Sequence, residues 1–130
     1  MIQLSHEQFE KIVADGIDAI PPLYQKNLKN VAFIIEDEPT MGQRQQLELF
    51  HGELLFGLYE GVPLPQRQGT TKVLPDKITI FKNPALVFSN SMEELREHVH
   101  HTIWHEVAHY YGLDHTQIHE LENKYRKKPD

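Results

Sequence analysis

The sequence predicts a single domain that combines α-helices with a few β-strands. Residues 5–20 repeat apolar side chains with a helical period, short apolar segments typical of strands lie between residues 31 and 82, and a second helical pattern begins at Ser91. The chain has 130 residues, which is enough for one hydrophobic core and too few for two. We therefore expect one domain that spans residues 1–130.

The composition is that of an ordinary globular protein, with 39% apolar residues, 25% charged residues and a net charge of −6. The negative charge argues against nucleic acid as a partner. There is no cysteine, so any metal must be held by His, Asp or Glu. No apolar segment has the length of a membrane span, and residues 1–5 do not resemble a signal peptide. These features predict a cytoplasmic protein with no membrane partner, and they do not predict an oligomeric state.

Residues 5–20 are expected to form an amphipathic helix. Ser5 and Gln8 match the capping box that opens many helices, and Pro21-Pro22 ends the pattern. One stripe of the helix is apolar: Phe9, Ile12, Val13, Gly16, Ile17 and Ile20. This helix has a structural role in our interpretation, since it carries no group suited to chemistry, and we expect it to cover a sheet.

Three segments are predicted as strands. Residues 31–36 are apolar at every position but the last, which is typical of a strand buried on both faces. Residues 54–59 form a second candidate strand. Residues 77–82 alternate between isoleucine and other side chains, so we expect a half-buried strand at a sheet edge. The intervening residues 40–52 fit either a short helix or a mobile loop, and the glycines and prolines of residues 61–69 indicate a loop.

A long helix is predicted to begin at Ser91, which forms a second capping box with Glu94. Its apolar stripe is Met92, Leu95, Val99, Ile103, Val107 and Tyr111. Histidines follow a neighbouring stripe at the same helical spacing: His98, His101, His105 and His109. One helix therefore packs against the core and presents imidazoles beside the packed face.

The end of this helix carries the pattern H-E-x-x-H-x-x-G-x-x-H over residues 105–115. His105 and His109 lie one helical turn apart on one face, which suits two ligands of one tetrahedral metal ion. Glu106 is placed to act as general base on a metal-activated water. Gly112 can end the helix in a left-handed conformation, so that the chain turns and His115 becomes the third ligand. His101 is a weaker alternative, because three ligands in line on one helix cannot surround an ion.

A last helix is expected after this turn, capped by Asp114 or Thr116. Its apolar side would be formed by Ile118, Leu121 and Tyr125. The basic residues at its end, at positions 124–128, suit the negative end of the helix dipole and are interpreted as a solubilising terminus.

The motif matches the long signature of the metzincin peptidases. Together with residues 54–64 and 74–81, the segment 101–115 resembles the very small bacterial zincin-like proteins usually described as metallopeptidase family proteins. The resemblance implies a minimal α+β zincin-like fold, in which a small mixed sheet packs against the active-site helix. It also implies His105 and His109 as ligands, with the position of His115 as the third. The three methionines all precede His115, whereas metzincins have a methionine turn after the third ligand.

These observations predict a zinc-dependent metallopeptidase that binds Zn²⁺ through His105, His109 and His115. Its substrate would be a peptide or protein, and the strand at residues 77–82 would be a candidate rail for an extended peptide. Hydrolysis also needs a donor that stabilises the transition state. Four residues are candidates for that role: Tyr59, Tyr110, Tyr111 and His119.

Two other functions remain open at this point. The rRNA-maturation endoribonucleases are similar in having three histidines at these intervals, and their motif ends in a segment like residues 112–115. They typically have glycine at the position of Glu106. A non-catalytic interaction module would instead hold a structural metal with four protein ligands. Asp114 or His119 would then be the fourth ligand.

Overall fold

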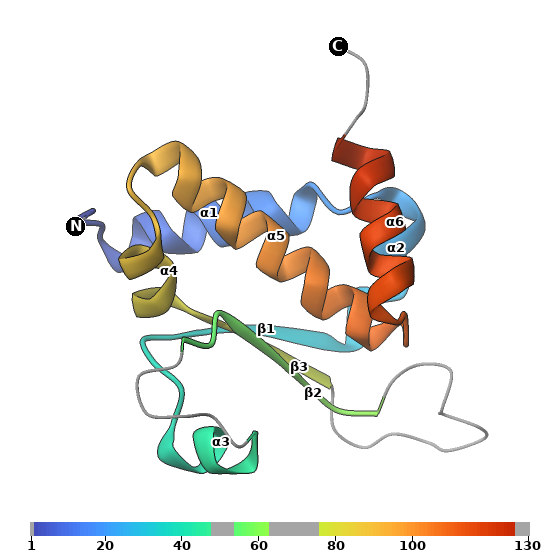
Figure 1. Ribbon diagram of the computed structural model, residues 1–130, viewed down its shortest axis with the longest axis horizontal. Coiled ribbons are helices and arrows are strands. Elements are labelled where there is room, and N and C mark those ends of the chain that lie inside the picture. The colour runs from blue at the N-terminus through green and yellow to red at the C-terminus, as the bar shows by residue number, and fades with distance from the viewer. Residues whose placement is uncertain (1, 48–53, 63–75, 127–130) are drawn as a thin grey trace.

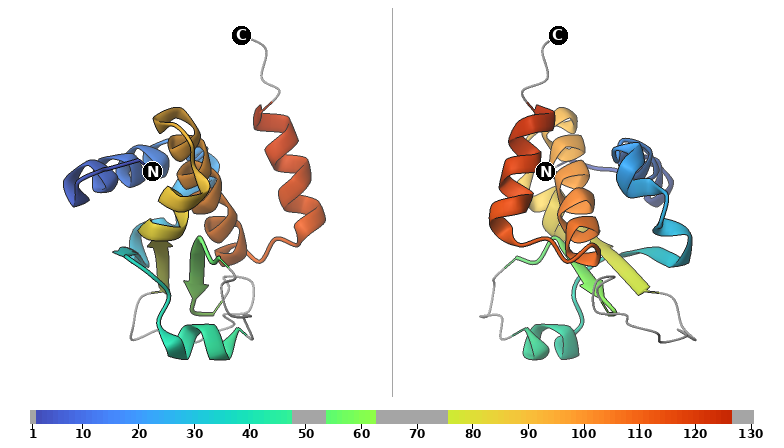
Figure 2. Two further views of the ribbon diagram at one scale, coloured as in Figure 1. Left: turned by 60° about the vertical axis from the view of Figure 1, so that its left-hand side comes forward. Right: turned by 90° about the vertical axis from the view of Figure 1, so that its right-hand side faces the viewer.

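The computed structural model describes residues 2–47, 54–62 and 76–126, except for the side chains of Lys29, His115, Glu122 and residues 124–126. The elements follow in the order α1 (His6–Asp18), α2 (Pro22–Gln25), the short 3₁₀ helix η1 (Leu28–Asn30), β1 (Val31–Glu36), α3 (Met41–Gln46), β2 (Gly57–Glu60), β3 (Asp76–Phe81), α4 (Lys82–Phe88), α5 (Met92–Tyr110) and α6 (His115–Arg126). Helices α1 and α5 lie on one side of a small sheet, and α3 lies on the opposite side of the molecule (Figures 1 and 2). The α+β architecture predicted from the resemblance is confirmed.

The three strands form one mixed sheet in the order β1-β3-β2. β1 pairs with β3 in parallel, from Val31 opposite Asp76 to Glu36 opposite Phe81. β2 pairs with β3 in antiparallel fashion, with Gly57 opposite Ile80. Within the part of the chain that the structure describes, β1 and β2 are therefore the edge strands.

The prediction that residues 77–82 form a half-buried edge strand is wrong. β3 is the central strand, and Lys82 already belongs to α4. Ile78 and Ile80 are buried as expected, but Thr79 and Phe81 on the other face are fully buried too. The alternation of side chains correctly indicated a strand, while the burial of its second face depends on segments distant in sequence.

Helix α5 is the element around which the core is built. It packs against α1 on one side and against β2 and β3 on the other. The predicted apolar stripe is buried along its length at Leu95, Val99, Ile103 and Val107. The α1 contact is close because Gly16 has no side chain there: a Cβ at this position would lie 2.7 Å from Ile103 Cδ1 and 2.9 Å from His100 Cδ2.

Aromatic side chains join α2 to the outer part of α5. The Tyr24 ring makes edge-on contacts with Trp104 at 5.1 Å and with Tyr111 at 5.2 Å between centroids. The Tyr111 hydroxyl donates to the Tyr24 carbonyl at 2.6 Å. Edge-on aromatic pairs contribute about 0.5–1.5 kcal/mol beyond burial. These contacts fix α2 beside the helix that carries the histidines.

The ambiguous segment at residues 40–52 begins as a helix, α3, which Thr40 and Gln43 open with a capping box. Residues 48–53 lie outside the described residues, as do residues 63–69 of the predicted loop. β2 is shorter than the strand predicted at residues 54–59, and it ends one residue later. No helix in the described segments has the length and hydrophobicity that crossing a bilayer requires.

Candidate metal centre

Helix α5 begins as the sequence predicts. Ser91 is the N-cap, and its hydroxyl accepts the Glu94 backbone N–H at 3.1 Å. The Glu94 side chain accepts from the Asn90 N–H and not from Ser91, so only half of the capping box forms. The helix then runs for 19 residues without a break, which carries the motif to its C-terminal turns.

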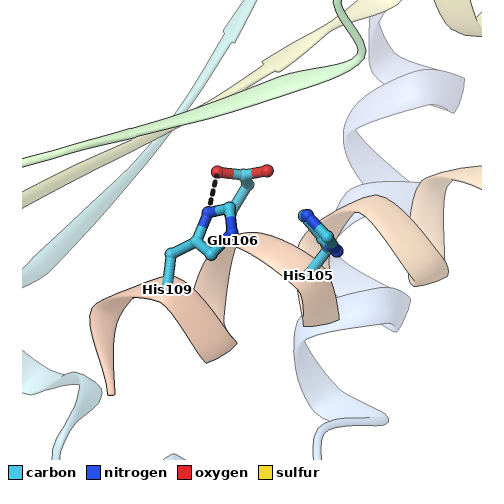
Figure 3. Close-up of side chains that lie close together, drawn as sticks. All are labelled: His105, Glu106 and His109. Atoms are coloured by element: carbon cyan, nitrogen blue, oxygen red, sulfur yellow. Dashed lines mark hydrogen bonds and ion pairs between the residues drawn. The ribbon is translucent and has the colours of Figure 1, made fainter. Parts of the chain in front are cut away.

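His105, Glu106 and His109 form a cluster near the end of α5. One ligand atom from each of the three residues lies within 4.8 Å of the others. The two imidazole centroids are 4.6 Å apart, and all three side chains leave the helix on the same side (Figure 3). Two imidazoles one turn apart with a carboxylate beside them are the donor types that zinc prefers, so the residues present fit that metal.

Glu106 is buried, and its Oε1 lies 3.3 Å from Nδ1 of His109. A histidine that donates through Nδ1 retains an unprotonated Nε2, which is the nitrogen free to bind a metal. The hydrogen bond to Glu106 raises the pKa of His109, and burial of the imidazole partly opposes this effect. The Glu106 carboxylate therefore orients the His109 ring and favours a proton on Nδ1, which leaves Nε2 for a metal.

Strand β2 packs against α5 beside Glu106, and Gly57 allows the strand to approach the helix closely. A Cβ on Gly57 would lie 2.5 Å from Thr102 Cγ2, 3.2 Å from Glu106 Cγ and 3.3 Å from the Thr79 carbonyl oxygen. A side chain at this position would require Thr102 to shift and would press on Glu106 and the Thr79 carbonyl. The signal for this position in the sequence is a glycine within a candidate strand, which is a known sign of close backbone approach.

The helix ends at the glycine of the motif. Gly112 has φ 74°, the left-handed conformation that glycine adopts without strain. Its N–H donates to the His109 carbonyl, and the Leu113 N–H donates to the Ala108 carbonyl, which together form a Schellman motif. α6 then leaves the turn at an angle to α5 (Figure 2). His115 is the first residue of α6, and its side chain lies outside the described part of the structure.

Three other candidate ligands have different surroundings. The Asp114 carboxylate accepts the Gln117 N–H at 2.8 Å, and the Gln117 side chain accepts the Asp114 N–H, so Asp114 is the N-cap of α6 as predicted. His101 is exposed, and its ring lies 6.1 Å from that of His105, farther than the His109 ring. His119 lies on the exposed side of α6.

The three tyrosines considered as transition-state donors direct their hydroxyls elsewhere. Tyr110 donates to the Asn27 carbonyl at 2.9 Å, and Tyr111 donates to the Tyr24 carbonyl. Tyr59 donates to Oδ2 of Asp76 at 2.6 Å. Burial raises the pKa of Tyr111, and hydrogen bonding with Asn27 partly opposes this effect. These contacts explain the tyrosines as structural residues.

Comparison with known proteins agrees with this geometry. No curated protein matches the chain. The family model described as zincin-like metallopeptidase matches residues 28–125, a segment that begins at η1 and includes the sheet, α5 and most of α6. The chain therefore belongs to the family of zincin-like metallopeptidases.

Proposed function

We propose that this protein hydrolyses peptide bonds with a zinc ion held by His105, His109 and His115, and with Glu106 as the general base. The observation that carries the proposal is the buried carboxylate of Glu106 between two imidazoles on one side of α5. Burying a carboxylate is costly unless it is paired, and Glu106 pairs with His109, one of the proposed ligands. Its position suits proton transfer next to a metal.

When bound, zinc supplies a Lewis acid that lowers the pKa of water to about 7 and polarises a carbonyl. The side chains of the protein supply the rest. Glu106 takes a proton from the attacking water and returns it to the leaving amine. Contact with Gly57 holds Glu106 on one side, and His109 holds it on the other, so its carboxylate is oriented before substrate binds.

His115 is the proposed third ligand. The turn at Gly112 reverses the chain directly after α5, so a residue of α6 can approach the pair from a second direction. Asp114 already serves as the helix cap, and His101 lies on the same helix as His105 and His109. His115 is the residue that these constraints favour.

The substrate backbone is proposed to add to β2, which is an edge strand among the described residues. This edge strand lies against α5 beside Glu106, whereas β3, the strand first considered for this role, is enclosed by its neighbours. An extended peptide can pair with the unpaired backbone groups of an edge strand. The scissile bond of a peptide paired with β2 would then lie beside the carboxylate of Glu106.

The decisive experiment compares zinc-loaded wild type with Glu106→Gln on a mixed peptide library, with metal content measured on both. We expect the variant to keep one zinc per chain and to lose about 10²–10⁴-fold in the rate of hydrolysis. The matched control is Glu97→Gln, which changes an exposed glutamate about two and a half turns earlier on α5 and should retain full activity.

Metal content identifies the third ligand separately. His115→Ala should lower zinc affinity by more than about 100-fold, while His101→Ala should leave it unchanged. A structured RNA incubated in parallel tests the nuclease alternative. Cleavage of RNA alone, or full peptide hydrolysis by Glu106→Gln, would contradict the proposed function.

A further inference from the structure

Three ring side chains gather beside the first half of α5, at the end of β2 that precedes the metal centre. The ring of Phe88, the last residue of α4, contacts the Phe56 ring at 5.4 Å and the His98 ring at 4.9 Å between centroids. We call Phe56, Phe88 and His98 the aromatic cluster. The site described above does not use any of the three residues.

The aromatic cluster adjoins the site through two direct links. Phe56 immediately precedes Gly57, the residue that packs on Glu106. His98 lies one turn before Thr102, which also packs on Gly57 and whose hydroxyl donates to the His98 carbonyl. From His98 to Glu106 is eight residues, or about 12 Å along the helix axis. An extended peptide covers that distance in about four residues.

The Phe88 ring is exposed, whereas Phe56 and His98 are half-buried and His98 is fixed in place. Phe88 is 56% exposed, which leaves much of a large apolar ring in contact with water. The His98 ring is held by Ser89, a residue only 3% exposed, whose Oγ lies 2.8 Å from Nδ1. Because the Ser89 hydroxyl donates to the Ala85 carbonyl, Nδ1 of His98 must be the donor in this pair. A surface ordered in this way loses little entropy when it binds a ligand.

The charges nearby restrict what the cluster can accept. Three glutamates, Glu93, Glu94 and Glu97, and one arginine, Arg96, lie on α5 within about a turn and a half of His98. The local charge is therefore net negative and disfavours an acidic side chain. A cavity lined by Ile2, Leu86, Val87, Ser89 and Asn90, the last three of them close neighbours of Phe88 in sequence, offers a surface of mixed polar and apolar character. A neutral aromatic side chain fits these surroundings best, since rings favour edge-on and offset contacts with other rings.

We propose that the aromatic cluster is a specificity subsite, which binds an aromatic side chain of the peptide substrate within about four residues of the scissile bond. The inference rests on the proposed function, because it takes the peptide to lie along β2. Phe88 is the specificity-determining residue, since it contacts both other rings and is the most exposed of the three.

Binding without turnover tests the subsite. Zinc-loaded Glu106→Gln protein would be titrated with fluorescently labelled nonapeptides of alanine, glycine and serine, in which one phenylalanine is moved along the sequence. We expect one position to bind about tenfold more tightly than the others, which is the effect of one good aromatic contact. Adding Phe88→Ala should abolish this difference, and Phe88→Tyr should preserve it. Leu23→Ala, at a residue of similar exposure on α2, is the control that should change nothing.

The outcomes separate the subsite from the proposed function. Equal binding at all phenylalanine positions, no binding, or an unchanged preference in Phe88→Ala would overturn the subsite. Cleavage of the library by wild type without enrichment of aromatic residues near the cut would also overturn it, while leaving hydrolysis intact. Position-dependent binding that requires Phe88, with no cleavage by wild type, would support the subsite and contradict the proposed hydrolysis.

Discussion

On each of two sides of α5 a neighbouring element packs closely through a glycine, α1 through Gly16 and β2 through Gly57. The two glycines face different atoms of the protein. On the α1 side, Gly16 lies against the ends of Ile103 and His100, which are movable parts of side chains. On the sheet side, Gly57 lies against Thr102, Glu106 and a backbone carbonyl of β3. The first contact packs the scaffold and the second positions the proposed general base. A substitution on each side should therefore have a different effect.

The largest effect is expected from Gly57→Ala. The added methyl would overlap Thr102 Cγ2 and press on Glu106 and the Thr79 carbonyl, so we expect a loss of about 1–3 kcal/mol in the free energy of unfolding. Peptide hydrolysis should fall by about 100-fold, because a displacement of about 1 Å in a catalytic group costs this much. Urea denaturation and initial rates would measure the two effects.

Thr102→Ser provides the control for this substitution, because it removes the methyl and keeps the hydroxyl that bonds the His98 carbonyl. Combined with Gly57→Ala, it should restore part of both the stability and the rate. Full activity in the single Gly57→Ala variant would show that the contact between β2 and α5 does not position Glu106.

A smaller effect is expected from Gly16→Ala in the last turn of α1. The clash with Ile103 and His100 is relieved by rotation of their side-chain ends, and alanine gains about 1 kcal/mol in helix propensity over glycine. We expect the free energy of unfolding to change by less than about 1 kcal/mol, with hydrolysis unaffected. Urea denaturation of both glycine variants under the same conditions makes the comparison. A loss of activity without a loss of stability would argue against a purely structural role for the α1 side.

The smallest effect concerns the protonation of His109. In metal-free protein the pKa of His109 lies above its ordinary value of 6.5, chiefly because of the hydrogen bond to Glu106. The stability that this pair contributes is present below pH 6.5 and is lost as the pH rises through the raised pKa. Glu106→Gln should lower the pKa of His109, as an NMR titration of its ring protons would show. An unchanged value would contradict the hydrogen bond.

Zinc would compete with the proton on His109. Metal affinity is therefore expected to fall as the pH decreases through the histidine range, and binding should release protons. Calorimetric titration in buffers of different ionisation enthalpy measures the number released.

Local sequence features predicted the helices and the group of His105, Glu106 and His109 more fully than the sheet. The spacing of His105 and His109 and the cap at Ser91 depend on neighbours within one or two turns, and both appear in the structure. The central position of β3 depends on which strands flank it, and no local pattern encodes that choice.

The tyrosines illustrate the same limit for the site. Tyr110 and Tyr111 are among the candidate transition-state donors that the sequence offers. Their hydroxyls bond carbonyls at Asn27 and Tyr24, which lie more than 80 residues away along the chain. Similarly, the role of Gly57 follows from its contact with Thr102 and Glu106, and this contact exists only once β2 and α5 are packed.

The aromatic contact between α2 and α5 has a practical consequence. Trp104 is the single tryptophan of the chain, and it directly precedes His105 while its ring lies against Tyr24. All tryptophan fluorescence of the protein therefore originates one residue from a proposed zinc ligand. The emission of Trp104 gives the native protein its own optical probe, with which metal uptake and release can be followed in real time without a label.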